Sequence, residues 1–266
     1  MKARHTWWIP FLMGGLALGG CTPAGLATAQ AEPQSLVVFA AASLGDTFRE
    51  LGDAFETAHP GVTVLLNVAG SQALRAQIEE GAEADVFAPA SRMDMEALIG
   101  TGKVIPPGQD FATNSLIIIV PPDNPKGITT PQDLARPGIR LVLAAEEVPV
   151  GRYARESLAR MAEAYGTSFA DAVLVNVVSN EENVRQVVAK VQLGEADAGI
   201  VYATDALSAP TLGRVWIPED QNVMATYPIA ALSDSSRPDL AAQFIAFVLS
   251  PDGQAALRRW GFGPPP

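Results

Sequence analysis

The chain has few of the residues from which metal centres and many active sites are built. It holds one cysteine, Cys21, and two histidines, His5 and His59. A single cysteine excludes an internal disulfide, although an exported compartment would permit one. His59 is followed by Pro60 and Gly61, a sequence typical of a helix end, and one such histidine supports neither a zinc cluster nor a Ser-His-Asp triad. These shortages favour a binding protein over an enzyme.

Positive charge is also scarce. The chain has 18 Lys and Arg against 29 Asp and Glu, a formal net charge of −11 at pH 7. Nucleic acids and anionic membranes attract basic surfaces, so we expect neither as a partner. An anion bound by this chain would have to be held by local geometry, against the field of the whole protein.

The first residues predict export. Lys2 and Arg4 form a basic n-region, and residues 7–18 are an apolar stretch of signal-peptide length, shorter than the about 20 residues of a membrane span. The sequence LGGC at 18–21 resembles the lipobox of bacterial lipoproteins, in which the cysteine is lipidated. We therefore predict a signal peptide at 1–20, lipidation of Cys21 and a flexible tether at 21–34. The alternative is an ordinary secretory peptide cleaved near 29–31, with Cys21 discarded.

Beyond the tether, apolar runs alternate with helical stripes. Strands are predicted at 36–41, 62–68, 85–88, 115–120, 139–144 and 199–202, with a strand returning across the molecule at 227–232. Helices are predicted from Leu44 to His59, around 74–78 and 93–98, at 152–165, from about 184, over 240–248, and from Ser250 to the end. The apolar run 173–178 precedes the helix near 184, for which Ser179 and Glu182 form a capping box. This alternation predicts an α/β fold, and two α/β units in one exported chain suggest two lobes with a cleft between them.

Two serines stand where strands give way to helices. Ser43 follows the run at 36–41 as the expected helix cap, and Ser71 follows Gly70 after the run at 62–68. In open α/β sheets ligands collect at the carboxyl ends of strands, where helix N-termini offer unpaired N–H groups to anions. Each serine alone is typical of a helix cap or a turn. Because the two occupy equivalent positions after consecutive strands, a shared ligand-binding role is about as well supported as two separate structural roles.

An ordered series of motifs extends over the rest of the chain. They are VFAAASL at 38–44, GSQ at 70–72, QI at 77–78 with Gly81, ADVF at 84–87, NSL at 114–116, VPVGRYA at 148–154, ENVR at 182–185, GIVY at 199–202, YPI at 227–229 and WGF at 260–262. In this series the sequence resembles the periplasmic molybdate-binding proteins of ABC importers, from about residue 36 to 262. No single motif is specific, but the whole series in order is.

The resemblance implies five oxyanion contacts. Ser43 and Ser71 would each contribute a hydroxyl and a backbone N–H, Val150 and Val184 a backbone N–H, and Tyr202 its phenolic hydroxyl. A fully deprotonated tetrahedral dianion only accepts hydrogen bonds, so a shell of neutral donors satisfies it and disfavours protonated anions. Molybdenum would thus be bound as molybdate, with no catalytic residue and no cofactor.

Four residues need comment beside this pattern. Val150 stands where relatives often carry alanine, which is tolerable for a backbone contact but would reshape the pocket. Arg152 is interpreted as a solvated arginine in a first helical turn, in preference to an anion ligand. Asp85 is interpreted as structural and Asp205 as a helix-start acid, both in preference to acid–base catalysts.

The resemblance implies a type II-like periplasmic-binding-protein fold with mixed, mostly parallel sheets and a ligand cleft between the lobes. Lobe I would hold 35–113 plus 227–266 and lobe II 114–226, with Ser43 and Ser71 on one wall and the other donors opposite. Closure around the anion would bring both walls to the same oxygens. We expect a periplasmic monomer that carries molybdate or tungstate to an ABC permease and touches the membrane only through its N-terminal lipid.

Two other functions remain open at this point. The donor set also suits sulfate or another tetrahedral dianion, because cavity volume cannot be deduced from sequence. An exported hydrolase using Ser43 or Ser71 is the other, although no base lies near either serine in the sequence.

Overall fold

A mixed sheet of nine strands runs through residues 34–266, the part of the chain that the computed structural model describes. The strands are β1 (Gln34–Ala41), β2 (Val62–Ala69), β3 (Val86–Ala88), β4 (Gln109–Val120), β5 (Leu141–Ala144), β6 (Val177–Glu181), β7 (Ala198–Tyr202), β8 (Gly213–Trp216) and β9 (Met224–Ala231). Their order is β2-β1-β3-β9-β4-β7-β5-β6, and β8 pairs with β4. With helices between most strands, this sheet confirms the predicted α/β class.

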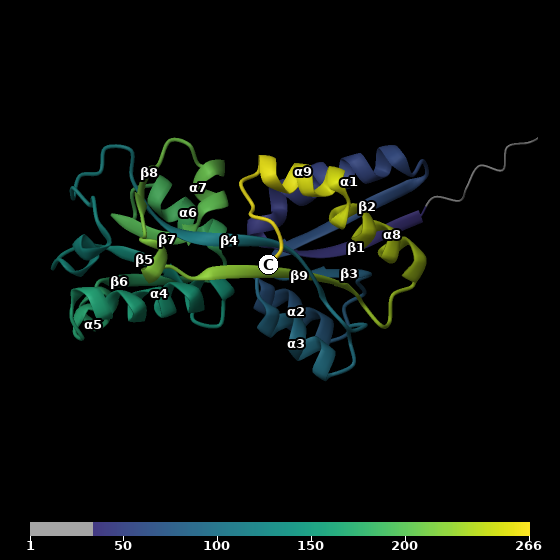
Figure 1. Ribbon diagram of the computed structural model, residues 1–266, viewed down its shortest axis with the longest axis horizontal. Coiled ribbons are helices and arrows are strands. Elements are labelled where there is room, and N and C mark those ends of the chain that lie inside the picture. Colours follow the sequence, from purple (N-terminus) through teal and green to yellow (C-terminus); the bar gives the residue numbers. More distant parts are fainter. Residues whose placement is uncertain (1–33) are drawn as a thin grey trace, which may run out of the picture. The chain divides into compact units, whose positions relative to one another are not determined.

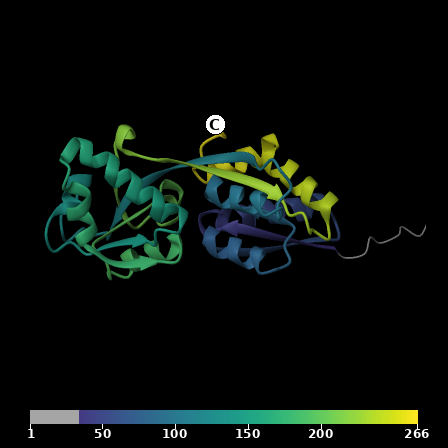
Figure 2. The same ribbon diagram turned by 90° about the horizontal axis from the view of Figure 1, so that it is seen from below.

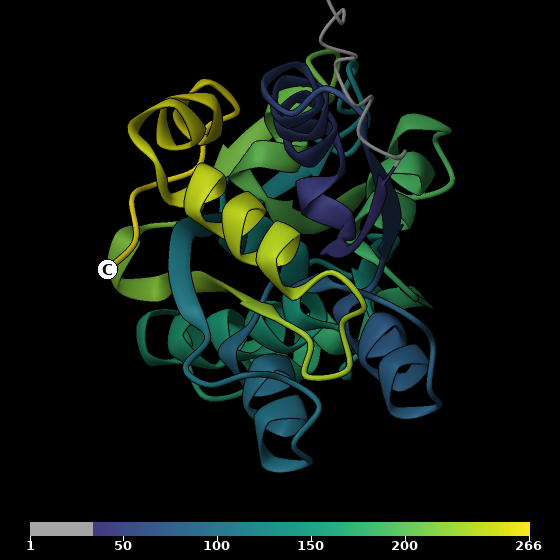
Figure 3. The same cartoon turned by 90° about the vertical axis from the view of Figure 1, so that its right-hand side faces the viewer.

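The helices lie on both sides of this sheet (Figure 1). They are α1 (Gly45–Ala58), α2 (Ser71–Glu79), α3 (Arg92–Gly100), α4 (Pro149–Tyr165), α5 (Phe169–Val175), α6 (Val184–Gln192), α7 (Ala203–Ser208), α8 (Pro238–Leu249) and α9 (Pro251–Arg259), with short 3-10 turns at η1 (Ala42–Leu44), η2 (Pro131–Ala135) and η3 (Glu219–Gln221). Helices α8 and α9 return from the C-terminal end of the chain to lie beside α1, as Figure 3 shows end-on.

Two long strands connect two groups of elements. The first group comprises β1–β3 with η1, α1–α3, α8 and α9, and the second comprises β5–β8 with α4–α7; β4 and β9 run between them (Figures 1 and 2). β4 pairs with β9 along its first half and with β7 and β8 along its second. The pairing with β9 explains why β4 begins at Gln109, six residues before the strand predicted at 115–120. It also confirms the predicted returning strand.

Within each group the strands are parallel. β1 pairs in parallel with β2 and β3, and β5 pairs in parallel with β6 and β7. The carboxyl ends within one parallel set lie at one edge, so the segments that follow them are gathered together. The described residues, 34–266, belong to one compact unit, and the predicted lobe boundaries stay a prediction.

Helix α1 shows how the apolar pattern becomes core. Leu44, Phe48, Leu51 and Phe55 are each at most 1% exposed, as their helical spacing predicts. The helix ends at His59, whose Nδ1 donates to the Phe55 carbonyl at 2.9 Å and whose ring stacks on that of Phe55. The single histidine of the described residues is therefore structural, as its position before Pro60 predicts.

The capping box predicted for Ser179 and Glu182 is wrong. Ser179 lies in β6, which pairs with β5 as far as Glu181, so the strand extends beyond the predicted helix start. The N-cap of α6 is Asn183, whose side chain accepts from the Gln186 N–H at 3.2 Å. The apolar run 173–178 is divided between the end of α5 and the start of β6.

The other helix boundaries agree with the sequence more closely. Ser250 caps α9 by accepting from the Gly253 N–H, with Pro251 at the first position, as predicted. The predicted signal peptide, Cys21 and most of the tether lie outside the described residues, although Gln34 already belongs to β1. Over the part that the structure describes, no helix is long and apolar enough to cross a membrane.

Candidate functional site

One cavity gathers all five predicted oxyanion contacts. It is small: its volume is about 10 Å³, far below the ~300–1,000 Å³ usual for organic ligands, so only a group of a few atoms has room there. The residues that line it are Ala41, Ala42, Ser43, Gly70, Ser71, Ala90, Val148, Pro149, Val150, Asn183, Val184 and Tyr202. None of them carries a charged side chain.

The topology explains why these segments meet. η1, α2 and the segment containing Ala90 follow the carboxyl ends of β1, β2 and β3, while α4, α6 and Tyr202 lie at or after the ends of β5, β6 and β7. Six strand ends from both groups thus point to one place, as ligand sites in open α/β sheets do.

The two serines lie in the first group and are buried, Ser43 at 4% and Ser71 at 1% exposure. The expectation that Ser43 is a helix cap is wrong: it lies inside η1, and its hydroxyl is 3.0 Å from the hydroxyl of Tyr227 on β9. For Ser71 the N-cap position is taken by Gly70, and the Ser71 Oγ accepts from the Ala90 N–H at 3.0 Å. Neither hydroxyl caps a helix, so both are available to hydrogen-bond a ligand in the cavity that the two serines line.

The second group supplies helix N-termini. Val150 is the second residue of α4 and Val184 the first of α6. Backbone N–H groups in a first helical turn have no acceptor within the helix, and the helix dipole favours an anion beside them. Gly151 lets α4 start this close to β5, because a Cβ there would lie 2.0 Å from the Ala145 carbonyl oxygen. The two valines therefore present backbone donors at the cavity.

Tyr202 ends β7 with a buried hydroxyl that has no hydrogen-bond partner among the described residues. Leaving a buried hydroxyl unsatisfied costs about 1–3 kcal/mol, so a ligand in the cavity that accepts from this hydroxyl would remove that cost. Burial raises the pKa of Tyr202 well above its ordinary value, so the hydroxyl keeps its proton and remains a donor.

Arg152 is not part of the cavity lining. Its guanidinium carbon lies 5.5 Å from the ring centroid of Tyr153, a cation–π arrangement. This position agrees with the interpretation of Arg152 as a first-turn arginine in α4. The lining therefore consists of neutral groups only.

Arg185 is the residue near the site that sequence reasoning missed. It follows Val184 in α6 and reaches across to the first group, where its Nη2 lies 2.9 Å from Asp46 Oδ2 and its Nε donates to the Ala42 carbonyl at 3.3 Å. Burial alone would raise the pKa of Asp46, but Arg185 and Arg49 outweigh it and lower that pKa. Arg185 belongs to the ENVR motif, but no local sequence pattern reveals a partner 139 residues away.

A second contact across the same place joins the groups. The Gln72 Nε2 donates to the Glu182 carbonyl at 2.9 Å. A Cβ on Gly70 would lie 2.5 Å from that same carbonyl oxygen, so the two backbones approach closely only because residue 70 is glycine. Together with Arg185, these contacts hold α6 against η1 and α2 directly beside the cavity.

Asp205 lies in the first turn of α7, where a helix-start acid was expected, but it is also fully buried. Burial raises its pKa to about 7, against the opposing effect of Arg185, whose Nε is 3.2 Å from Asp205 Oδ1. It does not line the cavity. Asp85 accepts from the Val37 N–H at 2.8 Å and from the Ser235 hydroxyl at 2.6 Å, which fits the structural role predicted for it.

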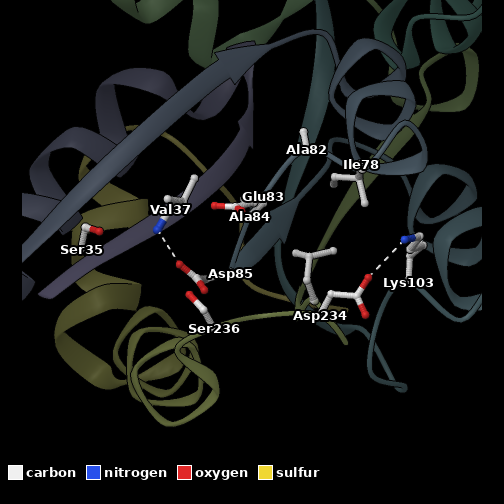
Figure 4. A pocket seen from close by; sticks show the side chains of 12 residues that line it. Ser35, Val37, Ile78, Ala82, Glu83, Ala84, Asp85, Lys103, Asp234 and Ser236 are labelled. Atoms are coloured by element: carbon white, nitrogen blue, oxygen red, sulfur yellow. Dashed lines mark hydrogen bonds and ion pairs between the residues drawn. The ribbon is translucent and has the colours of Figure 1, made fainter.

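A wider cavity lies at the other ends of the first-group strands (Figure 4). It is bounded by Val37 of β1 and by Asp85, and Lys103 pairs there with Asp234 at 3.1 Å. It contains none of the predicted contacts and lies at the amino ends of β1 and β3, so we do not assign the ligand to it. Among the described residues no three His, Cys, Asp or Glu side chains are grouped to hold a metal ion.

The comparisons with known proteins agree with this geometry. Residues 36–263 match the family described as bacterial extracellular solute-binding protein. The molybdate-binding protein ModA of Mycobacterium tuberculosis is 39% identical over 257 residues, covering 96% of this chain and 95% of that one. The chain belongs to the ModA family of extracellular solute-binding proteins. This membership confirms the prediction that it is a binding protein and not an enzyme.

Two further relatives extend the comparison. A putative ABC transporter substrate-binding lipoprotein of Bacillus subtilis, YvgL, is 28% identical over 98% of this chain and 99% of its own. The structure of the periplasmic molybdate-binding protein of Azotobacter vinelandii superposes with a TM-score of 0.75 at 19% identity, covering 87% of this chain and all of that one. The second likeness confirms the expected periplasmic-binding-protein fold.

Proposed function

We propose that this chain captures molybdate outside the cytoplasm and delivers it to the permease of an ABC importer. The observation that carries the proposal is the small cavity lined only by neutral groups, with the unpartnered Tyr202 hydroxyl in its wall. The similarity to ModA proteins supports molybdate as the ligand. Tungstate is expected to bind with it, because the two anions are nearly identical in size and charge.

The proposed site residues are those that the family resemblance implies, and their place in the lining of one cavity supports them. Ser43 and Ser71 would each donate a hydroxyl and a backbone N–H, Val150 and Val184 a backbone N–H, and Tyr202 its phenolic hydroxyl. Every one of these groups can donate, and a fully deprotonated dianion offers only acceptors. Fixed dipoles then stabilise the charge without a basic side chain, which agrees with the acidic composition of the chain.

We further propose that binding and closure are coupled. Ser43 and Ser71 belong to predicted lobe I (35–113 plus 227–266), and Val150, Val184 and Tyr202 to predicted lobe II (114–226). An anion that bonds donors on both walls favours the arrangement in which the walls are close. The contacts of Arg185 and Gln72 across the cavity would add to the stability of that closed form.

The N-terminal assignments complete the proposal. A signal peptide at 1–20 would be removed, and a lipid on Cys21 would then hold the mature protein, a monomer, at the membrane through its tether. The Bacillus subtilis relative described as a lipoprotein supports this arrangement. Mass spectrometry of the mature N-terminus tests it, since a diacylglyceryl cysteine and a free N-terminus near residue 32 differ greatly in mass.

The function is tested by calorimetric titration of the purified chain with molybdate, tungstate, sulfate and phosphate. We expect molybdate and tungstate to bind with similar Kd values, and both far more tightly than sulfate or phosphate. Sulfate binding tighter than molybdate would instead make the chain a sulfate carrier, for which the same donors suffice.

A further inference from the structure

A serine hydroxyl is not a donor by nature, because it carries one proton and two lone pairs. A serine that is to donate to an anion must have its lone pairs engaged by other donors, so that its proton is left for the ligand. The partners of Ser43 and Ser71 on the side away from the cavity therefore decide which anions the site accepts.

Ser71 has a partner of this kind in the backbone. The Ala90 N–H donates to the Ser71 Oγ at 3.0 Å in a buried setting. A backbone N–H can only donate, so the Ser71 oxygen must accept there. Its own proton is then left for the cavity that Ala90 and Ser71 both line.

Ser43 has a side-chain partner, Tyr227, and the donor in the hydrogen bond between them depends on a third residue, Asn114. Its Oγ lies 3.0 Å from the Tyr227 hydroxyl, and Tyr227 is fully buried. The amide nitrogen of Asn114 donates to Thr204 Oγ1 at 2.8 Å and to the Tyr227 hydroxyl at 3.4 Å. With the Tyr227 oxygen accepting from Asn114, the arrangement that we infer directs the Tyr227 proton to Ser43, which lies within hydrogen-bond distance on its other side.

The surroundings keep this chain of bonds intact. The Tyr227 ring packs edge-on against Phe111, Tyr202 and Phe262, which holds its hydroxyl in place. Burial raises the pKa of Tyr227 above its ordinary value, so the phenol keeps the proton that it donates. Ser43, Asn114 and Tyr227 are all buried, so water does not compete for their hydrogen bonds.

We propose that Tyr227 and Asn114 are positioning residues that make Ser43 an obligate donor, and that they thereby set the preference for fully deprotonated anions over protonated ones. This inference rests on the proposed function. Without the Tyr227 proton, the Ser43 hydroxyl is free to turn and accept. It then donates less well to molybdate or sulfate and is able to accept the proton that every form of phosphate carries at neutral pH.

The test compares wild type with Tyr227→Phe, which retains the ring and loses only the hydroxyl. Each is titrated with molybdate, sulfate and phosphate at pH 7.5, with Tyr165→Phe as the matched control, since Tyr165 packs on Phe169 at the end of α4 and not at the cavity. In Tyr227→Phe we expect molybdate and sulfate to bind about five- to tenfold more weakly, the change expected for one weakened hydrogen bond. Phosphate should be unchanged or tighter.

A double-mutant cycle separates positioning from simple damage to the fold. In a Ser43→Ala background, Tyr227→Phe should have no further effect on molybdate, because the hydroxyl that it orients is gone. An equal loss in both backgrounds would overturn the proposal, and so would an equal loss for all three anions. Tighter molybdate binding in Tyr227→Phe would show that the chain runs in the opposite direction.

Asn114→Leu provides a second variant should Tyr227→Phe fold poorly. It removes the amide donor and should lower the molybdate-to-phosphate affinity ratio in the same direction; an unchanged ratio in a folded Asn114→Leu protein would contradict the inference. Failure of the proposed function is recognised separately. It appears in the wild type as tighter binding of sulfate than molybdate, which leaves the inference testable with sulfate, whereas a wild type that binds none of the three anions refutes both.

Discussion

The unpartnered hydroxyl of Tyr202 leads to an unusual expectation for the variant Tyr202→Phe. The hydroxyl is buried, and none of residues 34–266 gives it a hydrogen-bond partner. Removing it therefore removes an unsatisfied group from the unliganded protein, whose free energy of unfolding should be unchanged or higher by about 1 kcal/mol. The substitution retains the ring, which packs edge-on against that of Tyr227 at 5.8 Å between centroids.

The anion should respond in the opposite direction. A hydrogen bond to a charged group contributes about 1.5–3 kcal/mol, so losing one should weaken molybdate binding about tenfold to 150-fold. Thermal unfolding with and without molybdate measures both effects in one experiment, and calorimetry measures the Kd itself. Tyr165→Phe, outside the cavity, serves as the control.

The reasoning would be refuted by either of two results. Unchanged molybdate affinity in Tyr202→Phe would mean that the hydroxyl does not contact the anion. A clear loss of stability in the unliganded variant would mean that the hydroxyl is satisfied within the protein after all.

Three other predictions concern the contacts around the cavity. Arg185→Met should weaken molybdate binding about tenfold, because it removes the contacts across the site. In the same titration, Arg152→Met should change the Kd less than twofold. A larger loss in Arg152→Met than in Arg185→Met would contradict the neutral-donor account. Gly70→Ala should also weaken binding by about tenfold with the fold retained, because its Cβ would lie 2.5 Å from the Glu182 carbonyl oxygen in the closed form; wild-type affinity would show that this approach is unimportant. The pKa of Asp205 rises from 3.8 in the unfolded chain to about 7 in the folded protein, so the folded state binds the proton more tightly and its stability falls as pH rises between those values. Denaturant unfolding should therefore show that Asp205→Asn loses less stability than wild type across that pH range. The same pH dependence in both proteins would refute the shift.

Much of the fold was predictable because it depends on local patterns. The stripe of Leu44, Phe48 and Phe55 predicts α1 since burial of one helix face follows its own period. The strand at β7 and the cap at Ser250 are recognisable for similar reasons. Each of these features is determined by residues within a few positions of one another.

The failures occurred where distant segments meet. Ser43 was expected to cap a helix, but its partner Tyr227 is 184 residues away, and no local pattern reports that contact. The spacing of Ser179 and Glu182 predicts a helix cap, but the pairing of β6 with the distant strand β5 extends the strand through Ser179. The five candidate contacts came from the resemblance to a family, since residues as plain as Val150 and Val184 carry no chemical signal of their own.

The most direct test of the neutral-donor site is the position of the anion itself. Tungsten scatters anomalously, so crystals grown with tungstate should show one strong peak in the cavity. The account predicts that its oxygens lie within about 2.6–3.2 Å of the Ser43 and Ser71 hydroxyls, the Val150 and Val184 backbone nitrogens and the Tyr202 hydroxyl. A tungstate bound instead to Arg152, or to any other arginine or lysine, would contradict it.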